Sequence, residues 1–452
     1  MIKLSGLNWG LFEFFALLLV FIIGFLITYF IMPFVCNLMK RKNYIGLDIH
    51  KNSRPEIPES GGIGILIGIT CTSIALILFF PFLLNEILIF TLTVILSGFI
   101  GFIDDRVKLR SRVKVILTIF TGTIIFLSNF FGFISIESPI IPFLGKLRLT
   151  LLYPIIIPII VAVFANTVNM FEGYNGQGAG SAIIVFIFLL VCAIIWDSAE
   201  GVLFTIVSLS VIIPFFIFNK YPSKVFPGDV GTLSIGAIFA GIALFGALEA
   251  AVFCALLVHV INSFFVLYSV KGFLESKDIQ DKKADVLLLK NDFLKASDQK
   301  DAALTLPRLI LAKGTLKEPK LVNNFFLLSI LSGIFSIITV LFMRWTIGAL
   351  DWNVLLLISI ILTLIIVVMI FLIKRIRGIM ILMAILMIGG YFLLIFIEVI
   401  VMPLSLIDIT IFGIIIPTNI VISLLIAIPC LIVWYYISIK YFWHQISKMP
   451  GD

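Results

Sequence analysis

Two adjacent carboxylates, Asp104 and Asp105, follow directly on the apolar run 87–103. Neighbouring carboxylates repel each other, which favours keeping one of them protonated. Such a pair suits a general base or a nucleophile. The alternative is a helix cap at a membrane surface, although placing two acids there is costly. Lys114 lies at the start of the next apolar run.

Two other segments place oxygen ligands beside glycines. Residues 166–180 concentrate carboxamides and glycines where an apolar run ends, and residues 225–232 place Asp229 between a turn and the next run. A hard cation bound to a diphosphate needs few protein oxygens, because phosphate and water complete its shell. The sequence therefore predicts Asn169 and Asp229 as ligands of Mg²⁺, with Mn²⁺ as the alternative metal.

The loop between the first two apolar runs has the composition of a rigid turn with charges on it. It reads Gly46-Leu47-Asp48-Ile49-His50-Lys51 and then Arg54-Pro55-Glu56-Ile57-Pro58-Glu59-Ser60-Gly61-Gly62. The prolines and the glycine pair favour a non-helical approach to the second run. We expect Lys51 to bind phosphate; the alternative is a turn with solvated charges. The three histidines of the chain are scattered, so no histidine-based mechanism is expected.

The longest polar stretch, 271–322, ends in Leu306-Pro307-Arg308 and Lys313-Gly314. A loop of this length in a compact protein is usually functional or a linker. We expect its last third, where proline and glycine restrict the backbone, to shape a site. A solvated charged connector remains the alternative for its first two thirds.

The elements that position these residues are apolar helices. The 452 residues are 61% hydrophobic and 13% charged, a balance typical of a chain solvated by lipid. Most runs reach the ~20 residues that span a bilayer, and continuous runs favour helices over barrel strands. We predict an all-α polytopic membrane bundle of about 13 helices, over 10–38, 62–85, 87–103, 114–133, 151–168, 181–196, 202–218, 231–248, 250–270, 323–343, 352–373, 378–401 and 411–438.

The basic residues predict the orientation of this bundle. Lys and Arg gather at 40–54, 106–114, 220–224, 271–320 and 374–377, whereas the intervening loops hold almost none beyond Lys146, Arg148 and Arg344. Thirteen spans with the N-terminus outside and the C-terminus in the cytoplasm satisfy the positive-inside rule. The net charge of +7 therefore reflects topology, and no nucleic-acid partner is expected.

In this order and at these helix ends, the polar segments resemble the polyprenyl-phosphate N-acetylhexosamine-1-phosphate transferase family, glycosyltransferase family 4. The match covers roughly residues 10 to 345. The loop 46–60 and Asn175 resemble the eukaryotic and archaeal branch, which transfers GlcNAc-1-phosphate to dolichyl phosphate, rather than the bacterial lipid I synthase. Family members transfer the sugar phosphate from a UDP-sugar to a polyprenyl phosphate and release UMP.

The resemblance implies a role for each candidate residue. Asn169 and Asp229 would bind Mg²⁺, Asp104 and Asp105 would deprotonate or position the lipid phosphate, and Lys114 would hold its charge. Substrate would be bound by Lys51, Glu56 and Arg308, and its uridine by Gly173, Asn175 and Phe226. Direct attack by the lipid phosphate and a covalent intermediate on Asp104 both remain open.

Two departures from the family are visible. The residues before Pro307-Arg308 read Ala302-Ala303-Leu304-Thr305-Leu306 instead of an Arg- and His-rich sequence, so another UDP-N-acetylhexosamine is the alternative donor. Residues 346–452 add three helices beyond a ten-helix transferase core at 1–345, and we expect them to face lipid or to form an oligomer contact such as a homodimer.

The Ile- and Phe-rich composition, together with motifs that resemble the eukaryotic branch, favours an archaeal plasma membrane. The endoplasmic reticulum is the eukaryotic alternative, and the active site is expected to be cytoplasmic in both. A secondary transporter is the competing class, but its signature is polar residues at the middle of spans, repeated in two halves. Here the polar residues gather at helix ends without a repeat.

Overall fold

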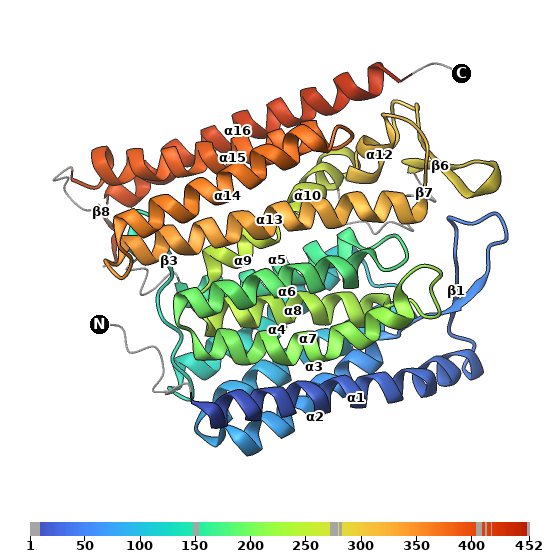
Figure 1. Cartoon of the computed structure of the whole chain (residues 1–452), viewed down its shortest axis with the longest axis horizontal. Coiled ribbons are helices and arrows are strands. Elements are labelled where there is room, and N and C mark those ends of the chain that lie inside the picture. The colour runs from blue at the N-terminus through green and yellow to red at the C-terminus, as the bar shows by residue number, and fades with distance from the viewer. Residues whose placement is uncertain are drawn as a thin grey trace.

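Long helices run side by side along one direction of the molecule (Figure 1). The structure is a computed structural model, and it describes residues 10–147, 153–271, 279, 283–403, 409–411, 414–416 and 418–449. Within these residues, strands form only short antiparallel pairings at the ends of the bundle. The prediction of an all-α membrane bundle is confirmed.

Twelve helices of the described chain are long and apolar enough to cross a membrane. They are α1 (Leu11–Arg41), α2 (Gly62–Phe79), α3 (Leu84–Val107, preceded by the 3₁₀ turn Pro81–Leu83), α4 (Ser111–Phe130), α5 (Tyr153–Phe171), α6 (Gln177–Trp196), α7 (Ala199–Asn219), α8 (Gly228–Phe245), α13 (Glu318–Thr346), α14 (Trp352–Leu372), α15 (Arg377–Phe396, continued by the π-helical turn Ile397–Val401) and α16 (Thr418–Ser447).

The predicted helix over 250–270 is broken in two. Helix α9 (Glu249–Ala255) and helix α10 (Leu257–Val270) meet at an angle of 67°. Counted as one bent span, the pair raises the total to thirteen, the number expected from the sequence. Asn262 on α10 donates to the Met170 carbonyl at 3.1 Å and accepts from the Leu306 N–H at 3.0 Å. The second half of the bent span therefore ties the end of α5 to the long polar loop.

Helix α8 lies at the centre of the bundle, where nearly all of its side chains are buried. It packs against α2, α3, α5 and α7. A Cβ atom added at Gly236 would lie 2.3 Å from the Ala165 Cα, so α8 and α5 touch backbone to backbone. Small residues permit such close approach in membrane bundles, where lipid gives apolar side chains little reason to associate.

The two ends of the bundle differ. One end, at the right of Figure 1, carries the hairpin of β1 (Ile45–Leu47) and β2 (Glu56–Pro58) together with the three-stranded sheet of β5, β6 and β7. That sheet comprises β5 (Val286–Leu288), β6 (Phe293–Ala296) and β7 (Leu316–Lys317), and it adjoins the short helix α12 (Leu306–Leu311). The other end carries β3 (Ile140–Ile141), β4 (Gly145–Lys146), β8 (Ile409–Ile411) and β9 (Ile414–Ile416).

Helices α14, α15 and α16 cover one side of the core and expose most of their surface, as expected for helices that face lipid. They share one buried apolar cluster with α10, α12 and α13. The long polar loop is thus in part an ordered structure, since a sheet and a helix occupy its residues 286–317. Within that stretch, residues 272–278 and 280–282 lie outside the described residues.

Candidate functional site

A cavity of about 480 Å³ opens at the end of the bundle that carries β1 and β2. Its walls come from the loop before β2, the α3–α4 junction, the end of α5 with the loop that follows, and the start of α8. The predicted residues that line it are Asp104, Asp105, Lys114, Asn169, Gly173, Asn175, Phe226 and Asp229. Four distant segments of the chain therefore meet at one place, as their shared position at helix ends predicted.

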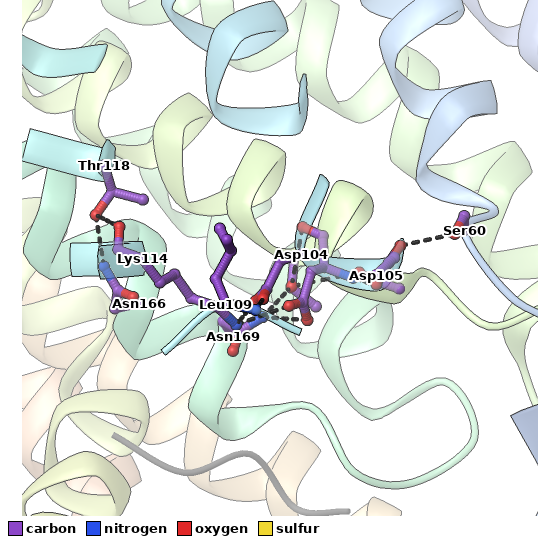
Figure 2. A network of polar contacts seen from close by, with 11 residues as sticks. Ser60, Asp104, Asp105, Leu109, Lys114, Thr118, Asn166 and Asn169 are labelled. Atoms are coloured by element: carbon purple, nitrogen blue, oxygen red, sulfur yellow. Dashed lines mark hydrogen bonds and ion pairs between the residues drawn. The ribbon is translucent and has the colours of Figure 1, made fainter. Parts of the chain in front are cut away.

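One ammonium group joins two carboxylates at the floor of this cavity. Lys114 Nζ lies 2.7 Å from Asp229 Oδ2 and forms a second close ion pair with Asp104 Oδ2 (Figure 2). All three side chains are buried. Buried charges persist only when they are paired, so Lys114 offsets two negative charges that would otherwise repel.

Asn169 extends this cluster on the side of α5. Its amide Nδ2 donates to Asp229 Oδ1 and to Thr232 Oγ1, both at 2.8 Å. With its nitrogen engaged, the amide oxygen of Asn169 is the atom that could bind a cation beside the Asp229 carboxylate. A carboxylate and a carboxamide at a cavity fit a hard cation that takes its other ligands from phosphate and water.

Asp104 and Asp105 do not act as a pair. Asp104 Oδ1 accepts from the Leu109 N–H at 2.6 Å, and its other oxygen faces Lys114. Asp105 turns toward β2 and α8, where Oδ1 accepts from the Asp229 N–H at 2.8 Å and Oδ2 accepts from the Ser60 hydroxyl at 2.7 Å (Figure 2). Successive helical residues point in different directions, so the two adjacent acids have different partners. Asp105 fixes the turn that carries Asp229.

Two glycines allow this meeting of α3 and α8. A Cβ atom at Gly101 would lie 2.3 Å from the Asp229 carbonyl oxygen, so any side chain there would displace the start of α8. Gly228 has φ +63°, a conformation that other residues adopt at a cost, and a Cβ there would lie 2.4 Å from Asp105 Oδ2. The glycines thus fix the separation of the two acid-bearing elements.

The other wall of the cavity is a second polar network. Asp48 Oδ2 accepts from Asn175 Nδ2 at 3.0 Å and forms a close ion pair with Lys51. The Asn175 N–H donates to Glu318 Oε1 at 2.7 Å. Ligand atoms of Asp48, His50 and Glu318 lie within 4.8 Å of one another, a spacing that a metal could use. Lys51 Nζ already provides the positive charge there, since it lies 3.9 Å from Glu318 Oε2 as well.

His50 and Glu172 are cavity residues that the sequence did not single out. The His50 ring stacks on Tyr174 with centroids 4.3 Å apart, and burial lowers its pKa to about 4, so it is neutral at pH 7. Burial raises the pKa of the Glu172 carboxyl to about 8. The signal for His50 was its place between Asp48 and Lys51, whereas the scatter of histidines along the chain pointed away from it.

Three residues predicted to bind substrate lie outside the described lining of the cavity: Lys51, Glu56 and Arg308. Lys51 forms ion pairs with the carboxylates of Asp48 and Glu318. Glu56 is exposed on β2, and Glu59 lines the cavity instead.

Arg308 is fully buried, and its guanidinium donates to four backbone carbonyls. The acceptors are Ser297, Gln299, Ala302 and Ala303, at 3.0, 2.6, 2.7 and 3.2 Å. The structure therefore places Arg308 inside the long loop, where it holds the loop together, and does not bring it to the cavity.

A second cavity, of about 550 Å³, lies at the opposite end of the bundle. Aromatic rings dominate its walls, including Phe143, Trp345 and Trp352, and Glu398 is the one acid among its described lining residues. Aromatic residues at a membrane interface commonly form such belts. The first cavity is instead lined by Asp104, Asp105, Lys114, Asn169, Asn175 and Asp229.

Comparison with known proteins agrees with this geometry. The model of Glycosyl transferase family 4 matches residues 87–247, which include the floor of the cavity. Two similar archaeal proteins carry names qualified as putative. One is a UDP-N-acetylglucosamine–dolichyl-phosphate N-acetylglucosaminephosphotransferase of Sulfolobus acidocaldarius, 35% identical over 56% of this chain and 77% of that protein. The other is a glycosyltransferase of Methanocaldococcus jannaschii, 31% identical over 69% of this chain and 96% of that protein.

A bacterial protein is similar as well. The phospho-N-acetylmuramoyl-pentapeptide-transferase of Staphylococcus saprophyticus is 31% identical over 56% of this chain and 83% of that protein. The Sulfolobus and Staphylococcus relatives therefore carry names for transfer of different sugar phosphates.

Proposed function

Since the chain belongs to glycosyl transferase family 4, we propose that it transfers N-acetylhexosamine-1-phosphate from a UDP-sugar to a polyprenyl or dolichyl phosphate and releases UMP. The observation that carries this proposal is the cluster of Lys114, Asp104, Asp229 and Asn169 at the floor of the cavity. Phosphoryl transfer depends mainly on alignment and on neutralisation of charge. Such a cluster supplies both.

In the proposed reaction, an oxygen of the lipid phosphate forms a bond to the β-phosphorus of the UDP-sugar. The bond from that phosphorus to the bridging oxygen breaks, and UMP leaves with the electron pair. Lys114 holds negative charge on the phosphates next to Asp104, which positions the lipid phosphate or accepts its proton. If Asp104 instead attacks first, UMP appears in a burst without any lipid acceptor, so a burst experiment separates the two courses.

Asn169 and Asp229 are proposed to bind Mg²⁺, because their oxygens lie beside the cavity and Asp105 fixes the backbone that carries Asp229. Bound Mg²⁺ would neutralise the donor diphosphate. Lys114, which pairs with Asp229 in this structure, would then have its charge available for the incoming phosphate.

The opposite wall is proposed to hold the nucleoside. Asn175 offers a side-chain amide, Gly173 permits close approach to the backbone, and the Phe226 ring lines the same cavity and can stack on a base. The favoured donor is UDP-GlcNAc and the favoured acceptor is dolichyl phosphate, as the name of the Sulfolobus relative suggests. Other UDP-N-acetylhexosamines are the alternative donors.

The active site is proposed to face the cytoplasm of an archaeal cell. Arg41 at the end of α1, Arg110 before α4 and Lys224 before α8 belong to the end of the bundle where the cavity opens, and basic residues mark the cytoplasmic side. Reaction of accessible cysteines placed in the loops at each end of the bundle in intact cells would check this orientation.

The test is transfer by the purified protein with Mg²⁺, a polyprenyl phosphate and labelled UDP-GlcNAc. We expect equal amounts of UMP and of a lipid-linked sugar phosphate, and Asp229→Ala should abolish both. Asp351→Ala is the matched control, because that acid caps α14 at the other end of the bundle. Absence of transfer with UDP-GlcNAc, UDP-GalNAc and their deoxy forms alike would reject the proposed function.

A further inference from the structure

The three C-terminal helices contact the polar loop that adjoins the cavity. Arg375, on the turn between α14 and α15, donates from Nη1 to the Gly314 carbonyl at 2.8 Å and to the Ile310 carbonyl at 3.4 Å. Lys313 Nζ returns a hydrogen bond to the Lys374 carbonyl at 3.3 Å. These bonds join the end of α12 to the α14–α15 turn.

Apolar packing reinforces the same junction. Figure 1 shows α12 between α13 and the ends of α15 and α16. Leu309 and Ile310 of α12 belong to one buried cluster with Ile376 and Met380 near the start of α15 and Phe442 of α16. The loop is thus held by α15 and α16, which follow the predicted transferase core at 1–345.

On its other side, this loop hydrogen-bonds to the wall of the cavity at two points. Glu318, which follows β7 directly and begins α13, accepts the Asn175 N–H at 2.7 Å. Asp292 Oδ1 accepts from both nitrogens of Asn52, at 2.7 and 2.9 Å, in the turn that follows Asp48 and His50. A small space behind the wall is lined by Pro307 and Thr305 from the loop and by His50 and Tyr174 from the wall.

We infer that Arg375 is a positioning residue for the wall of the cavity that carries Asn175 and is proposed to hold the nucleoside. It acts on Asn175 through α12 and Glu318. The inference rests on the proposed function for the identity of the ligand, but its structural content is independent of it. If the α12 junction loosens, Glu318 no longer holds the Asn175 backbone in place. Floor residues such as Lys114 belong to other helices and keep their geometry.

The experiment compares Arg375→Gln with Arg377→Gln. Arg377 lies two residues further on, and its guanidinium donates to the carbonyls of Ile370 and Phe371 at the end of α14 rather than to the loop. For Arg375→Gln we expect KM for the UDP-sugar to rise about tenfold, with kcat and the KM for the lipid phosphate retained, because a charge-assisted bond to the loop is lost. Arg377→Gln should leave all three values unchanged.

Two variants of Glu318 test the last step of the chain of contacts. Glu318→Ala removes the acceptor of the Asn175 N–H and should raise the donor KM as Arg375→Gln does. Glu318→Gln keeps an amide oxygen at that position and should restore most of the donor affinity. A purely structural role would move kcat and both KM values together, and that result would overturn the inference.

Amide hydrogen exchange separates this inference from the proposed function. The Asn175 amide should exchange faster in Arg375→Gln than in the parent or in Arg377→Gln, whether or not any sugar phosphate is transferred. Failure of transfer in the parent protein with normal exchange differences would reject the function and leave the positioning role supported. Unchanged Asn175 exchange in Arg375→Gln, or equal changes in both arginine variants, would refute the positioning role.

Discussion

Arg308→Lys should weaken the long loop and leave the chemistry of the site largely intact. The guanidinium donates from Nε, Nη1 and Nη2 to four carbonyls between Ser297 and Ala303, and these acceptors surround it on different sides. A lysine keeps the positive charge, but its single ammonium group cannot reach all of them. Arg308 is fully buried, so the carbonyls that lose the guanidinium as a donor would have no water to bond to instead.

The magnitude follows from the bonds lost. A hydrogen bond to a charged group is worth about 1.5–3 kcal/mol, and such bonds within one network are not additive. We take the net loss as about 3 kcal/mol, which corresponds to roughly a 10²-fold change in the local opening equilibrium.

Hydrogen exchange by the purified protein measures this opening at the Ala303 amide, which donates to the Lys283 carbonyl at 3.1 Å. We expect exchange to be about 10²-fold faster in Arg308→Lys. In Arg377→Lys, a substitution at a partly exposed residue, it should change little. In the same preparations kcat should stay within severalfold of the parent value.

The opposite pattern would refute this reasoning. If Arg308 contacts the sugar diphosphate, as the family resemblance implied, Arg308→Lys should reduce kcat by about 10²-fold or more. The Ala303 amide would then exchange at the parent rate. Loss of activity without loss of protection does not fit a guanidinium that donates to four backbone carbonyls of its own loop and lies over the Trp443 ring of α16.

Three further changes test the floor of the cavity. Lys114→Met should reduce kcat by about 10²–10³-fold because it removes the charge between Asp104 and Asp229. Lys114→Arg keeps a positive charge there and should retain part of the parent kcat. Equal kcat values in the two variants would contradict this role of the charge. Removal of divalent metal with a chelator should stop transfer and Mg²⁺ should restore it, as labelled product formation would report; transfer that persists with chelator would exclude the proposed metal. Gly101→Ala should lower the stability of the protein by about 1–3 kcal/mol and should also lower kcat, since its Cβ would lie 2.3 Å from the Asp229 carbonyl oxygen. A variant with the stability and kcat of the parent would show that α3 and α8 can separate without cost.

The pH dependence of stability tests the burial of His50. Its pKa is lowered from 6.5 to about 4 in the folded protein, so the stability it contributes is complete above pH 6.5 and is lost as the pH falls toward 4. The difference corresponds to about 3 kcal/mol. His50→Gln should therefore flatten the fall of the melting temperature between pH 6.5 and 4, and an identical slope in both proteins would count against the burial argument.

Much of the fold could be predicted from the chain alone because the signals are local. A span of lipid requires an unbroken apolar run, and each run is readable without its neighbours. The bend between α9 and α10 was not foreseen, because the run 250–270 is long and mostly apolar and the angle appears only when α10 contacts α5 and the loop. The π-helical turn at Ile397–Val401 likewise has no signal in hydropathy.

The candidate site divides in the same way. Asp104, Lys114, Asn169 and Asp229 could be proposed from the sequence, since polar residues at the ends of apolar helices are costly and therefore informative. That one lysine joins two of these acids depends on α4 meeting α8 across 115 residues of chain.

Tertiary contacts also decided what sequence adjacency and resemblance could not. Asp105 serves the Asp229 backbone rather than a carboxylate pair, because the close approach at Gly101 brings α8 to that face of α3. Arg308 is enclosed by its own loop, and Glu318 reaches Asn175 across 143 residues. Residue type and helix position set which chemistry was available, whereas packing between distant segments set which side chains face the substrate and which hold others in place.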